Sequence, residues 1–172
     1  MQASVSVSRT ILTLGGAFFL TAAGPAGPGP SWTGKWHGTL TNDPARPNAA
    51  KIEVVREIGV WPQKDGDCTE FRTIYSEAGV EKGRKDYRLC RRGGAGDLVV
   101  DEGGGLELSS RLLGDTLVSI FRYDEIVLFV TTRVRGGVME EEIYSATEKP
   151  AAKGVTVFPV RSVQRLVFTR KR

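Results

Sequence analysis

The amino-acid sequence predicts an all-β fold, an antiparallel up-and-down β-barrel of about ten strands. Short segments in which apolar and polar residues alternate follow one another along the chain, as expected of half-buried strands. Glycine-rich turns such as Gly136-Gly137 separate these segments, and no stretch of useful length has helical periodicity. Because tight turns join successive strands, each strand is expected to pair with its neighbour in sequence. This is the strand order of an up-and-down barrel, which closes when the first and last strands pair. A β-sandwich is the alternative arrangement.

Residues 1–23 have the composition of a secretory signal peptide. Arg9 is their only charge, an apolar run follows it, and small residues end the segment at Ala23, where we expect cleavage. The apolar run is shorter than the roughly 20 residues of a membrane-spanning helix, so no stable membrane insertion is expected. The protein is therefore predicted to be secreted or periplasmic. An uncleaved anchor is the alternative interpretation.

The folded part of the chain is predicted to be a single β-barrel domain, residues 31–172. Residues 24–30 are rich in proline and glycine and form a flexible lead-in that cannot lie inside a sheet. The first strand is expected over residues 31–41. Two tryptophans and two glycines share one face of it, which suits the crowded interior of a closing barrel: Trp32, Gly34, Trp36 and Gly38.

Nine further strands follow from the alternation of apolar and polar residues and from the turns between them. Two proline-containing stretches interrupt the pattern: residues 42–48 are predicted to be a loop, and residues 155–160 a short edge segment. A second loop is expected at residues 149–154. The predicted strands cover residues 51–60, 68–76, 84–91, 97–101, 106–113, 116–123, 125–135, 138–146 and 164–169.

The two cysteines, Cys68 and Cys90, predict a disulfide, as an even pair does in an exported protein. If they face each other in an antiparallel hairpin, opposite charges meet on the cysteine face and aromatic or apolar residues meet on the other. This division is expected of a true register, with the disulfide outside. The facing pairs are Glu70 with Arg88, Arg72 with Asp86, Phe71 with Tyr87, and Thr69 with Leu89.

Two later hairpins divide their faces in the same way. The turn at Gly114-Asp115 sets Glu107 against Arg122 and Leu108 against Phe121, whereas Gly136-Gly137 sets Arg133 against Glu140. On the inner, apolar face of the second hairpin lies Glu141, opposite Thr132. It is the one charge that the pattern places inside the barrel.

The sequence resembles the calycin superfamily, which contains the lipocalins and the fatty-acid-binding proteins. The resemblance rests on Gly34-Lys35-Trp36 in the first strand, on the strand count, and on a basic residue after the last strand. It implies a calycin-like barrel in which Trp36 packs near one closed end beneath Arg170. Arg165 is the other candidate for this cation–π contact with the tryptophan.

The spacing of glycine, tryptophan and histidine in the first strand is also similar to that of nitrobindin-type haem barrels. Those barrels bind iron through a histidine late in the chain, and His37 is the only histidine here. Haem binding of that kind is therefore not expected, and His37 is interpreted as a surface residue. No cofactor and no metal site are predicted.

The lumen is the candidate functional site. A ten-stranded barrel is wide enough to leave a cavity, so the expected function is binding of a small apolar or amphipathic ligand. The predicted ligand-binding residues are Phe71, Tyr87, Phe121, Tyr123 and Glu141. The alternatives are that the aromatic residues fill the barrel, and that Glu141 pairs with an interior arginine or lies near a wet rim.

Other function classes find less support in the sequence. No spacing suggests a catalytic partner for His37, so an enzyme is not expected. The formal net charge of +4 is mild and does not indicate nucleic-acid binding. The alternative function is that of a packed barrel whose loops or lead-in bind an envelope protein, as protease-inhibitor barrels do.

Overall fold

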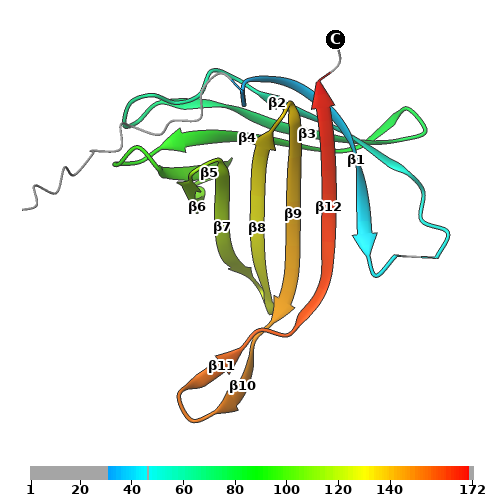
Figure 1. The fold of residues 1–172 in the computed structure, drawn as a ribbon, viewed down its shortest axis with the longest axis vertical. Coiled ribbons are helices and arrows are strands. Elements are labelled where there is room, and N and C mark those ends of the chain that lie inside the picture. The colour runs from blue at the N-terminus through cyan, green and yellow to red at the C-terminus, as the bar shows by residue number, and fades with distance from the viewer. Residues whose placement is uncertain (1–30, 46, 171–172) are drawn as a thin grey trace, which may run out of the picture.

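The computed structural model describes residues 31–45 and 47–170, in which ten strands form a closed antiparallel β-barrel (Figure 1). This confirms the predicted fold class. Around the barrel, β1 to β9 follow one another in sequence order. The last strand, β12, closes the barrel between β9 and β1. The predicted signal peptide, residues 1–23, and the lead-in, residues 24–30, lie outside the described residues.

The strands have nearly the predicted bounds. The largest differences are that β4 begins at Val80 and β12 at Val160, four residues earlier than predicted in each case. The barrel strands are β1 (Gly34–Asp43), β2 (Ile52–Ile58), β3 (Cys68–Glu77), β4 (Val80–Arg91), β5 (Asp97–Gly103), β6 (Leu106–Leu113), β7 (Thr116–Tyr123), β8 (Ile126–Arg135), β9 (Val138–Thr147) and β12 (Val160–Arg170).

The hairpin of β3 and β4 has the predicted register. Cys68 faces Cys90 and Phe71 faces Tyr87, and the two cysteines form a disulfide. The disulfide lies on the outer face, as predicted, but only Cys68 is exposed. Cys90 is completely covered by its neighbours.

The ion pairs beside this disulfide are only partly as predicted. Arg72 contacts Asp86 at 2.5 Å, but no contact joins Arg88 to the facing Glu70 among the described ion pairs. Arg88 instead contacts Asp101 of β5 at 2.6 Å. Asp101 also lies directly opposite Arg88, across the β4–β5 ladder. The hairpin register could not show this competing carboxylate, because it comes from the next strand.

The hairpin of β8 and β9 is also as predicted. Gly136 and Gly137 have φ angles of 57° and 79°, the left-handed conformation that a two-residue hairpin turn needs at both positions. Arg133 faces Glu140 and contacts it at 2.6 Å on the outer face. The inner face of β9 therefore carries Glu141.

The hairpin of β6 and β7 is correct only near its turn. The ladder runs from Leu113 and Thr116 to Ser110 and Ser119 and goes no further. The predicted pairs beyond this point, including Glu107 with Arg122, do not form. Both residues find other partners on the outer face: Arg92 for Glu107 and Glu148 for Arg122. The two strands separate toward their far ends.

Residues 149–157 form a small hairpin instead of the predicted loop and edge segment. β10 (Lys149–Ala152) pairs with β11 (Val155–Val157) in a separate two-stranded sheet. This hairpin projects from the end of the barrel where β9 ends and β12 begins (Figure 1). It explains why β12 pairs with β9 although two strands lie between them in sequence.

One end of the barrel is closed by the contact that the family resemblance implies. Trp36 is fully buried, and the guanidinium carbon of Arg170 lies 4.4 Å from the centre of a Trp36 ring. Gly38 allows β1 to approach β12 closely, because a Cβ there would lie 2.2 Å from the Val167 carbonyl oxygen. Arg165, the other candidate, lies on the outer face and contacts Glu142 at 3.0 Å.

Candidate cavity at the open end of the barrel

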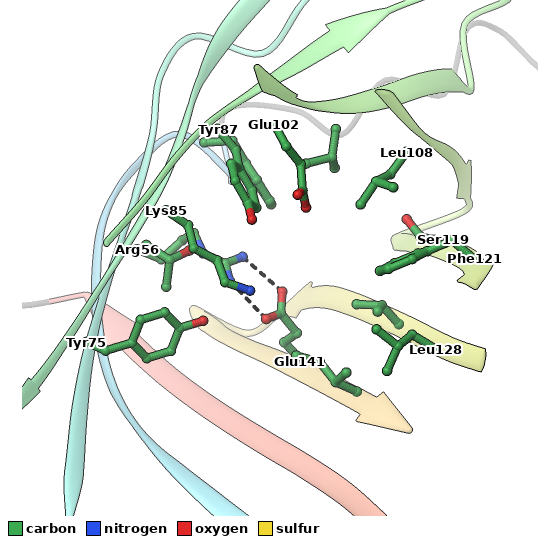
Figure 2. A pocket seen from close by; sticks show the side chains of 15 residues that line it. Arg56, Tyr75, Lys85, Tyr87, Glu102, Leu108, Ser119, Phe121, Leu128 and Glu141 are labelled. Atoms are coloured by element: carbon green, nitrogen blue, oxygen red, sulfur yellow. Dashed lines mark hydrogen bonds and ion pairs between the residues drawn. The ribbon is translucent and has the colours of Figure 1, made fainter. Parts of the chain in front are cut away.

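A cavity of about 120 Å³ occupies the other half of the lumen. It lies where two pairs of neighbouring strands separate. The β4–β5 ladder ends at Arg88 and Asp101, and the β6–β7 ladder ends at Ser110 and Ser119. Its wall is mostly apolar. The apolar side chains that line it include Val100, Leu108, Phe121, Leu128, Val130 and Ile143 (Figure 2).

A buried ion pair of Arg56 and Glu141 borders the cavity. Arg56 donates from its two terminal nitrogens to the two carboxylate oxygens of Glu141, both at 2.9 Å. The two residues are only 3% and 5% exposed. Thr73 accepts a hydrogen bond from Arg56 Nε at 2.7 Å, and Thr132 donates one to Glu141 at 2.8 Å. Every charge in the pair is therefore met by a partner, which a buried ion pair requires.

The environment of Glu141 keeps its carboxylate ionised. Burial alone would raise its pKa, but the charge of Arg56 and the hydrogen bonds from Arg56 and Thr132 lower it below the ordinary value. The Arg56 guanidinium also packs over aromatic rings, with its carbon 4.7 Å from the centre of Phe71 and 5.5 Å from that of Phe168. These contacts bury the cation against apolar surface.

The expectation that Glu141 is the one interior charge is wrong. Arg56 lies on the inner face of β2, opposite Thr73 of β3. The sequence held the signal that would have found it, because Arg56 has the same parity as Ile52 and Val54 on that strand. The alternative that Glu141 pairs with an interior arginine is therefore correct. Glu141 is already occupied by this contact.

A second set of polar groups lies closer to solvent. Lys85 of β4 and Glu102 of β5 both line the cavity, with Tyr87 between them in Figure 2. The Lys85 ammonium is 5.7 Å from the centre of the Tyr87 ring. Burial, together with the charge and hydrogen bonding of Glu102, raises the pKa of Tyr87 to about 12. The phenol therefore stays protonated and can donate a hydrogen bond at neutral pH.

The structure brings four of the five predicted ligand-binding residues together. Phe71, Tyr87, Phe121 and Glu141 all line the cavity. Tyr123 does not, because β7 has passed the cavity at this point and the residue is 68% exposed. Sequence reasoning missed Lys85, Glu102 and Tyr75. Lys85 shares the inner face of β4 with Tyr87, Tyr75 shares that of β3 with Phe71, and Glu102 follows Val100 on the inner face of β5. Their polar side chains suggested the outer face of the barrel.

The described residues offer a cavity with an apolar wall and a charged rim. Among residues 31–45 and 47–170, no group of three or more His, Cys, Asp or Glu side chains is placed to hold a metal ion. In the same part of the chain, no helix is long and apolar enough to cross a membrane. The arrangement is suited to enclosing a compact molecule, with hydrogen bonds and charge contacts at the rim.

Comparison with known proteins shows the fold and nothing finer. No protein-family model matches the chain, and no curated protein sequence matches it. Among solved structures, the crystal structure of Rv2717c from M. tuberculosis aligns with a TM-score of 0.52 at 13% sequence identity. The alignment covers 83% of this chain and 94% of that one. The two proteins are similar in fold across most of their length.

Proposed function

We propose that this protein binds a small amphipathic molecule in the cavity at the open end of its barrel. The observation that supports this proposal is the cavity itself. Its wall is apolar and aromatic, and a few polar groups converge at its rim, the arrangement typical of small-molecule sites. In this proposal the protein is a binding protein and not an enzyme.

The size of the cavity restricts the ligand. A volume of about 120 Å³ is well below the roughly 300–1,000 Å³ of pockets that hold drug-sized molecules. It is closer to the cavity of about 150 Å³ that holds benzene in an engineered protein core. The ligand in this proposal therefore has a short apolar part. The packed-barrel interpretation describes the closed half of this lumen and not the open half.

We also propose that the protein works outside the cytoplasm. The Cys68–Cys90 disulfide supports this proposal, because such bonds persist in oxidising compartments. The composition of residues 1–23, with a single charge and an apolar run, supports it independently. Both observations support secretion or a periplasmic location in this proposal. In protein purified from its own host, mass spectrometry is expected to find a new N-terminus at residue 24.

Native mass spectrometry and a titration test the binding function. Protein purified from its own host is expected to carry an extra small mass that mild organic extraction removes. The extracted protein is then titrated with 4-methyl-1-pentanol, a neutral amphipathic probe, and followed by amide chemical shifts. The Tyr87→Ala/Phe121→Ala double variant removes two aromatic walls and is expected to weaken probe binding at least about tenfold, or about 1.4 kcal/mol.

The matched control is Ile120→Ala, which truncates the neighbouring residue of β7. Ile120 points outward and is 64% exposed, so this variant is expected to bind the probe as the wild type does. If the double variant and the wild type bind the probe equally, the probe does not enter this cavity. That result would contradict the proposed function.

A further inference from the structure

The charges around the cavity balance, and only half of them are paired with each other. Two cations, Arg56 and Lys85, and two anions, Glu102 and Glu141, line the cavity. Arg56 and Glu141 form the buried ion pair and neutralise each other. Lys85 and Glu102 remain, and neither forms an ion pair with a described residue, although the Lys85 charge also acts on Glu141 and Tyr87 hydrogen-bonds to Glu102. The cavity therefore presents one positive and one negative group to its contents.

The fold keeps these two groups apart. Lys85 and Tyr87 share the inner face of β4, and the register of the β4–β5 ladder would place Glu102 opposite Tyr87 if the ladder continued past Arg88 and Asp101. Lys85 and Glu102 are thus diagonal neighbours on two strands that separate at this point. The Tyr87 ring lies between them in Figure 2. The two charges form two poles at the rim and do not meet.

The geometry points to a compact zwitterion as the ligand, an apolar α-amino acid or a molecule with the same two charges and a short apolar group. Its anionic group lies by the Lys85 ammonium, and its cationic group lies by the Glu102 carboxylate. The apolar group enters the cavity toward Phe121, Leu128 and Ile143. This inference rests on the proposed function and specifies its ligand class.

The charge balance is the physical reason for preferring a zwitterion to a simple acid or amine. A charge that is taken out of water is costly unless an opposite charge meets it. A carboxylic acid would satisfy Lys85 but bring its own negative charge toward Glu102, and an amine would do the reverse. A zwitterion meets both poles and leaves the total charge of the filled cavity at zero.

The position of Tyr75 fits the anionic end of the ligand. Its hydroxyl points into the cavity from β3, on the same side as Lys85 and toward the Arg56–Glu141 pair (Figure 2). Burial raises the pKa of Tyr75, so the hydroxyl stays a hydrogen-bond donor. A carboxylate beside Lys85 therefore has a neutral donor nearby as well as a cation.

Four probes with closely matched branched chains test the inference by amide chemical-shift titration of the full mature protein. L-Leucine carries both charges, 4-methylpentanoate only the negative one, 3-methylbutylamine only the positive one, and 4-methyl-1-pentanol neither. L-Leucine is expected to bind at least tenfold more tightly than the acid or the amine. Lys85→Met and Glu102→Gln are each expected to weaken leucine binding at least tenfold and to weaken binding of the alcohol, which carries no charge, by a much smaller factor.

The control variant is Lys82→Met, which removes an exposed lysine of the same strand that does not line the cavity, and it is expected to bind leucine normally. If the acid or the amine binds as tightly as leucine, the zwitterion inference is wrong and the ligand carries a single charge. If the alcohol binds in the cavity and leucine binds no better, the inference is wrong but the proposed function stands. If no probe shifts the cavity residues, the proposed function fails as well.

Discussion

The closed and open halves of this barrel are built from the same strands and differ in how those strands pair. In the closed half, neighbouring strands stay in register and large apolar side chains fill the lumen, among them Trp36, Leu89, Met139 and Phe168. In the open half, β5 leaves β4 and β6 leaves β7. The interior there holds a cavity and four charged side chains.

The difference shows how a ten-stranded barrel can be both packed and hollow. Side chains from opposite walls meet only where the walls stay close, and a wall that opens leaves volume that they do not fill. Lys85 and Glu102 are tolerated there, because both remain at least partly exposed to solvent. The Arg56–Glu141 pair lies at the boundary, next to the packed half, and is satisfied entirely by protein groups.

The largest effect on stability is expected from disrupting the Arg56–Glu141 ion pair. Glu141→Gln leaves the Arg56 cation buried without its partner and is expected to lower the free energy of unfolding by about 3–5 kcal/mol at pH 7. The double variant Arg56→Met/Glu141→Leu removes both charges and is expected to recover most of that loss. Urea unfolding measures both. Equal destabilisation by the single and double variants would contradict the assignment of a coupled pair.

The pH dependence of this variant follows from the lowered pKa of Glu141. A carboxyl group whose pKa is lower in the folded state stabilises the fold above its ordinary value near 4.5, and this stabilisation is lost as the pH falls through the folded-state pKa. The stability difference between wild type and Glu141→Gln is therefore expected to shrink below about pH 4.5. A difference that stays constant from pH 7 to pH 3 would contradict it.

Truncation of one apolar side chain in each half compares the two directly. Leu89→Ala removes a fully buried side chain from the packed half and is expected to cost about 2–5 kcal/mol in unfolding free energy. Phe121→Ala removes a larger side chain, but one that is half-buried and already borders a cavity, so its cost is expected to be smaller. Thermal and urea unfolding of both variants test this order, and the reverse order would contradict the division of the lumen.

The disulfide is expected to stabilise the whole barrel and not one half. It joins residues separated by 22 positions in sequence, and its loss is expected to cost about 3 kcal/mol, mainly through the unfolded chain. The variant Cys68→Ser/Cys90→Ser tests this by urea unfolding. Because the disulfide lies on the outer face, probe binding in the cavity is expected to stay at its wild-type strength, and a parallel loss of binding would contradict this expectation.

The smallest effect is expected from an ion pair on the outer face. Arg133 and Glu140 contact each other at 2.6 Å, more closely than the 2.9 Å of the buried pair, but both are exposed. A double-mutant cycle with Arg133→Ala and Glu140→Ala is expected to give a coupling of roughly 0.2–1 kcal/mol, decreasing with salt. A coupling as large as that of Arg56 with Glu141 would show that burial does not distinguish the two pairs.

Much of the fold could be predicted because its information is local. The parity of residues along a strand tells which face each side chain occupies, and a tight turn then sets the register of the partner strand. The register of the β3–β4 hairpin came from the expected pairing of Cys68 with Cys90, which the structure confirms. The two rules predicted that Thr132 faces Glu141, as observed. They failed where a competing partner came from the next strand, as with Arg88 and Asp101.

The cavity could be predicted only in part. Phe71, Tyr87 and Phe121 were found because apolar residues on an inner face are expected to point into the lumen. Tyr123 lies outside the cavity, and parity alone does not tell where the lumen ends along a strand. Lys85 and Glu102 were missed, since their charge was taken to indicate solvent exposure, although Lys85 has the same parity as Tyr87 on its strand.

By itself the sequence determined the barrel, the register of the β3–β4 and β8–β9 hairpins, and the disulfide, because each depends on segments close together in sequence. Only the tertiary structure decided that Arg56 meets Glu141 across 85 positions of sequence. β2 and β9 are not neighbours in the sheet, so no turn and no ladder relates them. They approach each other across the lumen only after the sheet has closed, and which strands separate at the open end then decides where the cavity lies.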